Sequence, residues 1–144
     1  MVTRDAARIR AWLAARAEPL IVKPVDGHGG KGIFLLAQGD RNVGSILEGL
    51  TEEGTRWVMA QAYLPAARQG DKRIILVDGE PLGAILRVPR GTITAATSTS
   101  AAPSCPPPSP RDREICAALG PRLRADGLSF VGIDVIGDHL TEST

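Results

Sequence analysis

The stretch that decides the fold is LIVKPVDGHGGKGIFLL, residues 20–36. An apolar run typical of a strand lies on each side of the glycine-rich segment DGHGGKG, residues 26–32. Its glycines fit the spacing G-x-G-x-x-G, but the dinucleotide-binding form of that motif opens a helix, and here a second strand follows. A P-loop is excluded because Lys31 is followed by glycine and not by Ser or Thr.

The remaining interpretation is a strand–loop–strand unit whose backbone amides cover phosphate groups. A plain hairpin turn is the alternative, but four glycines within six residues exceed what such a turn needs. Lys23 lies in the first strand, between Val22 and Pro24. Lysine is depleted at such positions unless its ammonium has a partner, and a nucleotide phosphate would supply one.

Around this unit the sequence alternates between helical and strand patterns, which indicates an α+β fold. The patterns predict one helix that Thr3 caps and that runs to about residue 17, and others at 42–50 and about 111–125. Strands are predicted at 56–64, 72–77, 81–88, 128–137 and 139–142, with a hairpin turn at Asp78-Gly79.

The composition narrows the class of protein. The chain has 144 residues, of which 43% are hydrophobic, and a net charge of +1 gives no electrostatic case for nucleic acid or an anionic membrane. An aromatic content of 3% argues against a base-stacking surface. We expect a cytoplasmic protein, because no apolar stretch could span a bilayer and no signal peptide is evident. Cys105 and Cys116 do not have the spacing of metal ligands.

Asp134 lies inside the apolar run FVGIDVIG and must be paired or bind a metal, because burying a lone carboxylate is costly. Glu142 follows on the next predicted strand, and the two share a face if an odd number of residues, such as 137–139, forms the turn. Two convergent carboxylates suit Mg²⁺. A salt bridge from Asp134 to Arg73 or Arg87 explains the pattern equally well.

Arg73 and Arg87 lie on the two arms of the Asp78-Gly79 hairpin. In such arms arginine is often a solvated edge residue. Near phosphate and metal, its planar guanidinium would instead stabilise a transferring phosphoryl group.

Three segments, residues 21–34, 59–91 and 112–142, closely resemble the bacterial type of glutathione synthetase, an ATP-grasp ligase. The resemblance implies an incomplete ATP-grasp fold with two small α+β subdomains, about 1–61 and 62–144. It also implies that ATP phosphorylates γ-glutamylcysteine and that glycine attacks the acyl phosphate. Another ATP-grasp peptide ligase and a non-catalytic nucleotide-binding remnant are the alternatives.

The resemblance further implies site residues, which fall into three groups. Those that contact ATP are Lys23, Gly27, Gly29 and Gly30 at the phosphates and Gln61, Ala62, Tyr63 and Leu64 at the adenine. Those that face phosphate and dipeptide are Arg73 and Arg87. The ligands of Mg²⁺, or Mn²⁺, are Asp134 and Glu142.

The sequence departs from the family in ways that predict an incomplete, inactive fragment without the homo-oligomer of the complete family. The family has a substrate-binding domain upstream of Met1, an Asn at the position of Thr144, and a loop Arg-Gly-Asn-x-x-x-Gly-Gly. Here TAATSTSAAPSC, residues 94–105, stands in that loop's place. Codons for residues 94–103, read in another frame, can encode the family loop, so we interpret residues 91–109 as a frameshifted, poorly packed segment.

Overall fold

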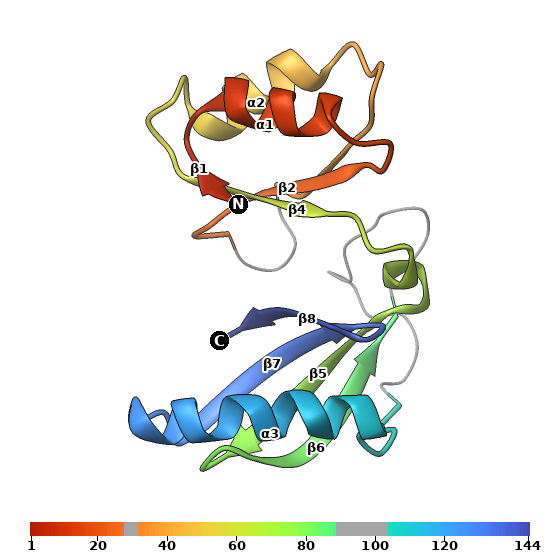
Figure 1. The fold of residues 1–144 in the computed structure, drawn as a ribbon, viewed down its shortest axis with the longest axis vertical. Coiled ribbons are helices and arrows are strands. Elements are labelled where there is room, and N and C mark those ends of the chain that lie inside the picture. Colours follow the sequence, from red (N-terminus) through yellow and green to blue (C-terminus); the bar gives the residue numbers. More distant parts are fainter. Residues whose placement is uncertain (28–31, 89–103) are drawn as a thin grey trace. The chain divides into compact units, whose positions relative to one another are not determined.

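Each half of the chain folds around its own antiparallel sheet, as the computed structural model shows for residues 1–27, 32–88 and 104–144 (Figure 1). Two compact units result, Met1–Tyr63 and Leu64–Thr144. Each unit combines one four-stranded sheet with helices, so the predicted α+β class is confirmed. None of the helices in the described part of the chain is long and apolar enough to cross a membrane.

The first unit has two helices packed on one face of its sheet (Figure 1). The strands, in the spatial order β1-β4-β2-β3, are β1 (Val2–Thr3), β4 (Val58–Ala62), β2 (Leu20–Pro24) and β3 (Phe34–Leu36). The helices are α1 (Ala6–Ala14) and α2 (Val43–Thr51). The core between helices and sheet contains Ile9, Leu13, Leu20, Val22, Leu36, Leu47, Leu50, Val58 and Ala60.

The expected cap of the first helix is wrong. Thr3 belongs to β1, where it pairs with Val58, and Asp5 caps α1 by accepting hydrogen bonds from the amides of Ala7 and Arg8. Thr3 assists one step earlier, because its hydroxyl accepts from the amide of Asp5. Both residue types are good N-caps, and pairing with β4 commits Thr3 to a strand.

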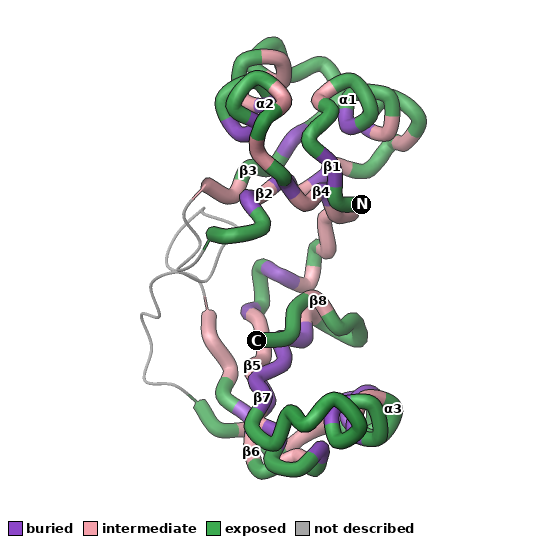
Figure 2. Tube along the Cα trace, turned by 90° about the vertical axis from the view of Figure 1, so that its left-hand side faces the viewer, coloured by how far each residue is buried: buried purple, intermediate pink, exposed green. Residues whose placement is uncertain are grey.

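The second unit has a single long helix on one face of its sheet (Figure 1). The strands, in the spatial order β6-β5-β7-β8, are β6 (Glu80–Arg87), β5 (Asp71–Val77), β7 (Phe130–Ile136) and β8 (His139–Ser143). Helix α3 spans Pro110–Ala125, close to the predicted 111–125, and a short 3₁₀ helix spans Pro65–Gln69. Figure 2 shows β7 buried along most of its length.

The hairpin between β5 and β6 turns at Asp78-Gly79 as predicted, with φ of 48° and 77° at the two residues. Positive φ at both central positions matches the twist of the strands and is favoured by the Asp-Gly pair. The turn also touches α3 closely, because a Cβ added at Gly79 would lie 2.8 Å from the Cα of Gly120. Glycine is therefore required on both sides of this contact.

Most of the segment interpreted as frameshifted, residues 91–103, lies outside the described residues. None of the described residues at its end, 104–109, is buried, but two of them make ordered contacts. Ser109 caps α3 in a capping box with Asp112, in which each side chain accepts from the other's backbone amide. Ser104 also accepts a hydrogen bond at its carbonyl from the amide of Leu86, at 2.9 Å.

Candidate functional site

The sheet face of the second unit that lies opposite α3 carries four charged side chains, which we call the ion cluster. Strand alternation places them there, because Ile74 and Leu76 of β5 point into the core with α3 and their neighbours point away. The members of the ion cluster are Asp71, Arg73, Arg87 and Asp134.

Asp134 is the centre of the ion cluster. Arg73, its direct partner across β5 and β7, donates from Nε and Nη2 to the two carboxylate oxygens at 2.8 and 2.7 Å. Nη2 of Arg87 lies 2.9 Å from Oδ2 of the same carboxylate. The salt-bridge interpretation of the buried carboxylate is therefore realised with both arginines at once.

Asp71 extends the ion cluster by one residue. It lies opposite Arg87 in the β5–β6 pairing and accepts from the guanidinium with both oxygens, one of them 3.2 Å from Nε. Sequence reasoning missed Asp71. Its position two residues before Arg73 was the available signal, because residues two apart on a strand share a face, but the predicted strand began one residue later, at 72, whereas β5 begins at Asp71.

The ion cluster keeps Asp134 charged. Burial alone would raise the pKa of Asp134, which is only 6% exposed, but hydrogen bonds from Arg73 and the charge of Arg87 outweigh burial and lower the pKa below its usual value. The hydrogen bonds to Asp134 raise the pKa of Arg73 in turn. The face therefore presents a fixed set of charges at neutral pH.

Glu142 lies directly opposite Asp134 in the β7–β8 pairing, so the two carboxylates share a face. The turn between β7 and β8 is not the predicted three-residue turn. Ile136 pairs with His139 across a two-residue turn, and a bulge between Asp134 and Val135 then shifts the register. The bulge adds the extra residue that the three-residue turn was expected to supply.

The two carboxylates form a minimal donor set for a divalent cation. Within residues 1–27, 32–88 and 104–144, no group of three or more His, Cys, Asp or Glu could hold a metal ion. Mg²⁺, however, is commonly held by one or two carboxylates together with substrate phosphates, and Asp134 with Glu142 fits that pattern. Thr144, at the position of the family's Asn, pairs with Gly132 through backbone hydrogen bonds of 2.8 Å.

In the first unit, Lys23 lies on β2 between two buried residues, Val22 of the core under the helices and Pro24. Lys23 is half-buried and belongs to the opposite face of that sheet. Gly27 follows β2, while Gly29 and Gly30 lie outside the described residues. Gly32 has a φ of 73°, and a Cβ there would come within 3.2 Å of the Pro24 ring, so this position needs glycine.

The four residues expected at the adenine lie where the first unit meets the second in sequence. Gln61 and Ala62 end β4, with their backbones opposite Ile21 and Leu20 of β2. The amide of Tyr63 donates to the carbonyl of Pro19 at 3.0 Å, and Leu64 begins the second unit.

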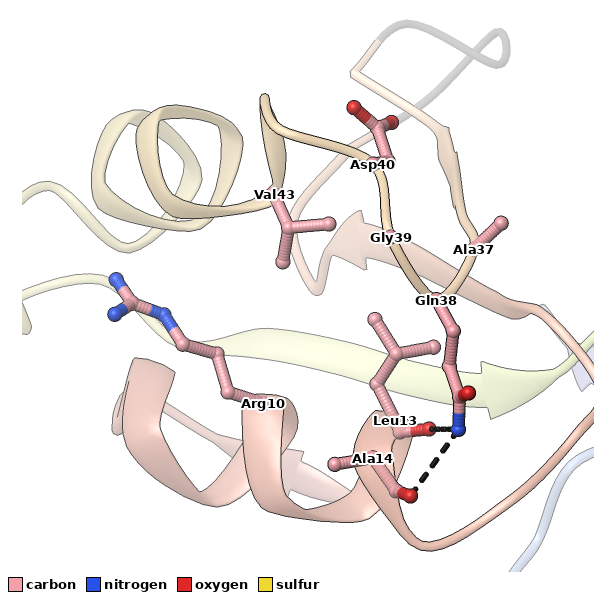
Figure 3. A pocket seen from close by; sticks show the side chains of 8 residues that line it. All are labelled: Arg10, Leu13, Ala14, Ala37, Gln38, Gly39, Asp40 and Val43. Atoms are coloured by element: carbon pink, nitrogen blue, oxygen red, sulfur yellow. Dashed lines mark hydrogen bonds between the residues drawn. The ribbon is translucent and has the colours of Figure 1, made fainter.

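A separate hollow of about 370 Å³ lies between α1 and α2 and contains none of the predicted residues (Figure 3). Arg10, Gln38 and Asp40 are its polar lining residues, and Nε2 of Gln38 donates to the carbonyls of Leu13, Ala14 and Arg16 at 2.7 to 3.2 Å. These bonds satisfy the carbonyls that are left open at the C-terminal end of α1. The hollow is therefore explained by helix capping.

Comparison with solved structures identifies the fold. D-cycloserine synthetase DcsG superposes with a TM-score of 0.72 at 20% identity, over 99% of this chain and 55% of that protein. D-alanine–D-alanine ligase from Bacillus anthracis, complexed with ATP, gives a TM-score of 0.55 at 19% identity, over 88% of this chain and 39% of that protein. At such identities the likeness shows the ATP-grasp fold alone, which confirms the predicted architecture.

Comparison with sequences identifies the family. Glutathione synthetase from Synechococcus elongatus is 51% identical over 99% of this chain and 44% of its own length. Glutathione synthetase from Gloeobacter violaceus is 55% identical over 85% of this chain and 38% of its own length. The chain thus spans less than half the length of these relatives. The family model described as "Prokaryotic glutathione synthetase, ATP-grasp domain" matches all of residues 1–144, and the chain belongs to this family.

Proposed function

We propose that the chain is the nucleotide-binding part of a ligase that joins glycine to γ-glutamylcysteine at the expense of ATP. The observation that carries this proposal is the ion cluster with Glu142 beside it, on one sheet face of a chain in the glutathione synthetase family. A carboxylate is a poor electrophile, and phosphoryl transfer would convert the dipeptide's carboxylate into an acyl phosphate that an amine can attack.

In this proposal Lys23 contacts a phosphate of ATP. Its half-buried position on β2, just before the glycines, limits its reach and keeps the ammonium close to the sheet face. A lysine is a compact point charge and binds phosphate without a fixed geometry. The amide of Gly27 would add a donor to phosphate, and the other glycines expected there, Gly29 and Gly30, lie outside the described residues.

Arg73 and Arg87 would neutralise charge on the transferring phosphoryl group or on the dipeptide. Their guanidinium groups are held side by side by Asp134, which removes much of the entropy cost of aligning them. Asp134 and Glu142 would hold Mg²⁺ or Mn²⁺, which when bound neutralises phosphate charge. A bidentate guanidinium matches both phosphate and carboxylate oxygens, which are the groups that ATP and the dipeptide present.

A second candidate is nucleotide binding without ligation. Thr144 favours it, because a threonine stands where the family has an Asn metal ligand and its hydroxyl lies 3.4 Å from the Gly132 carbonyl. A weaker metal site would leave phosphate contacts from Lys23 in place. This candidate predicts ATP affinity with no release of ADP when γ-glutamylcysteine and glycine are added.

The test is calorimetric titration of Mg·ATP into the 144-residue chain and its Lys23→Ala variant. Loss of a charge-assisted contact should weaken binding by about tenfold or more. The matched control is Arg41→Ala, which removes an exposed cation of the same unit. Equal affinity of Lys23→Ala and the unchanged chain would remove Lys23 from the site. ADP release that depends on both γ-glutamylcysteine and glycine separates ligation from binding alone.

A further inference from the structure

Asp71 is the member of the ion cluster to which the proposed function assigns no role. It is the first residue of β5 and lies directly opposite Arg87, the last residue of β6. Both of its carboxylate oxygens accept hydrogen bonds from the Arg87 guanidinium, one of them from Nε at 3.2 Å. Such a bidentate pair fixes the orientation of the guanidinium plane as well as balancing its charge.

Arg87 needs such a partner to be oriented at all. It ends β6, which is an edge strand of the sheet, and an arginine side chain at such a place has many conformations open to it. To reach Asp134 on β7 the side chain must cross β5, because β5 lies between those two strands. Asp71 lies on the strand that is crossed, so it directs the guanidinium across the sheet face.

Asp134 cannot serve Arg87 alone. Its two oxygens already accept from Nε and Nη2 of Arg73, and Nη2 of Arg87 shares one of them at 2.9 Å. Asp134 is also one of the two residues that we propose for Mg²⁺. Within the described part of the chain, by contrast, the Asp71 carboxylate pairs with Arg87 and no other cation. Asp71 is therefore the acid on which the direction of Arg87 depends most.

The backbone brings the two residues together where their strands meet. Gly70, which precedes Asp71, has a φ of 113°, and a Cβ added there would lie 2.6 Å from the carbonyl oxygen of Arg87. A residue with a side chain would push the start of β5 away from the end of β6. Glycine at position 70 thus allows β5 to begin at Asp71, directly opposite Arg87.

Folding stability is a weak explanation for this pair. The side chain of Asp71 is 15% exposed and that of Arg87 is 25% exposed, so both charges are largely removed from water. The cost of that desolvation commonly cancels the attraction between the charges. The pairing also leaves the two N–H donors of Arg87 Nη1 without a partner among residues 1–27, 32–88 and 104–144. An anionic ligand could accept from them.

We propose that Asp71 is a positioning residue, which orients the Arg87 guanidinium toward the terminal phosphate of ATP. This inference rests on the proposed function and commits Arg87 to the phosphoryl group. Asp71 acts through Arg87, because a carboxylate without its arginine would repel a nearby polyphosphate. Loss of an orienting group and loss of a repelling charge therefore predict changes of opposite sign in the affinity for that phosphate.

The experiment compares the affinities for Mg·ATP and Mg·ADP, measured by calorimetric titration of the 144-residue chain and its variants. Their ratio reports contacts to the terminal phosphate, because ADP lacks it, and general damage to the unit weakens both ligands alike. Asp71→Asn should lower the ratio about fivefold, somewhat less than full loss of a charged hydrogen bond. The matched control is Glu80→Gln, which removes an exposed acid at the other end of the same hairpin and should leave the ratio unchanged.

A double substitution tests whether Asp71 acts through Arg87. Arg87→Gln should lower the ratio at least as much as Asp71→Asn, and the doubly substituted chain should match Arg87→Gln alone. Asp71→Glu keeps the charge but moves the oxygens by one methylene, so its ratio should fall between those of the unchanged chain and Asp71→Asn. It carries the test if circular dichroism shows that Asp71→Asn does not fold.

Three results would contradict these expectations. An unchanged or raised ratio in Asp71→Asn would overturn the inference and leave nucleotide binding intact. A further fall on adding Asp71→Asn to Arg87→Gln would also overturn it, because the carboxylate would then act independently of the arginine. A chain that binds neither Mg·ATP nor Mg·ADP would overturn the proposed function and this inference with it.

Discussion

The two units present different chemistry on sheets of the same size. The first offers one lysine, Lys23, beside a glycine-rich segment, so its contacts to a ligand would come largely from the backbone. The second offers the ion cluster and Glu142, which are side chains from four strands. A site made of backbone groups can be predicted from a short local sequence. A cluster of side chains from several strands can be predicted only if the register of those strands is known.

The units also differ in how they bury polar groups. In the second unit Asp112 is fully buried and pairs with Lys72, on the opposite sheet face from the ion cluster. Burial opposes ionisation of Asp112, but the hydrogen bond from Lys72 and those of the capping box hold its pKa below the usual value. The ion pairs reported within the first unit's described residues are all partly or largely exposed.

The largest effect is expected from Asp112→Ala. This substitution removes the buried carboxylate that pairs with Lys72 and also removes the capping box of α3. The free energy of unfolding should therefore fall by about 3 kcal/mol. Glu114→Ala is the control, because Glu114 forms only an exposed pair with Arg111. Urea unfolding followed by circular dichroism measures both variants.

Tryptophan fluorescence sharpens this measurement. Both tryptophans, Trp12 and Trp57, belong to the first unit, so their emission reports that unit alone. Asp112→Ala should move the circular dichroism transition and leave the fluorescence transition in place. Equal shifts by both probes would show that the two units unfold as one cooperative block. The buried ion pair of the second unit would then stabilise both units and not the second alone.

The sequence predicted the helices, the hairpin and every strand except β1, because each of these is a local pattern, whereas Thr3 of β1 was predicted to cap a helix. A short apolar run marked β2, and Asp-Gly marked the turn between β5 and β6. It predicted less of the ion cluster. Placing Glu142 opposite Asp134 required a bulge that one sequence cannot reveal, because a two-residue turn alone would have put the two on opposite faces.

A smaller effect on stability is expected from glycine-to-alanine substitutions in α3 and α2, and its sign should differ between the two helices. Gly120 of α3 lies against the hairpin turn, and a Cβ there would come within 2.6 Å of the Gly79 carbonyl oxygen. Gly120→Ala should therefore cost about 2 kcal/mol of unfolding free energy, although alanine is the better helix former. Gly49 of α2 has nothing within 4 Å of its added Cβ, so Gly49→Ala should stabilise its unit by up to about 1 kcal/mol.

In thermal unfolding measurements, Gly120→Ala should lower the unfolding temperature of its unit and Gly49→Ala should raise that of the other unit. Circular dichroism would show the loss for Gly120→Ala, and tryptophan fluorescence would show the gain for Gly49→Ala. Stabilisation by Gly120→Ala would mean that the hairpin turn and α3 separate easily, so that helix propensity alone decides. The close approach of Gly79 and Gly120 would then not hold the second unit together.

The smallest effect is a difference in acid sensitivity between the units. Asp112 and Asp134 of the second unit have folded pKa values below the unfolded value of about 3.9. Between those values the unfolded chain binds more protons than the folded chain, so stability rises with pH. The contribution of these acids is complete above about pH 5 and is lost as pH falls through the folded pKa values.

Acid should therefore lower the urea midpoint of the second unit, by circular dichroism, more than that of the first, by tryptophan fluorescence. Asp26 of the first unit also has a lowered pKa, but its side chain is largely exposed, so Asp26→Asn should leave the fluorescence profile unchanged. Asp134→Asn should flatten the circular dichroism profile between pH 5 and 3, because it removes one titrating group of the ion cluster. A profile as steep in Asp134→Asn as in the unchanged chain would show that Arg73 and Arg87 do not hold that carboxylate ionised. The charged face would then owe its stability to other contacts, and the arginines would be held by Asp71 and Glu142 instead.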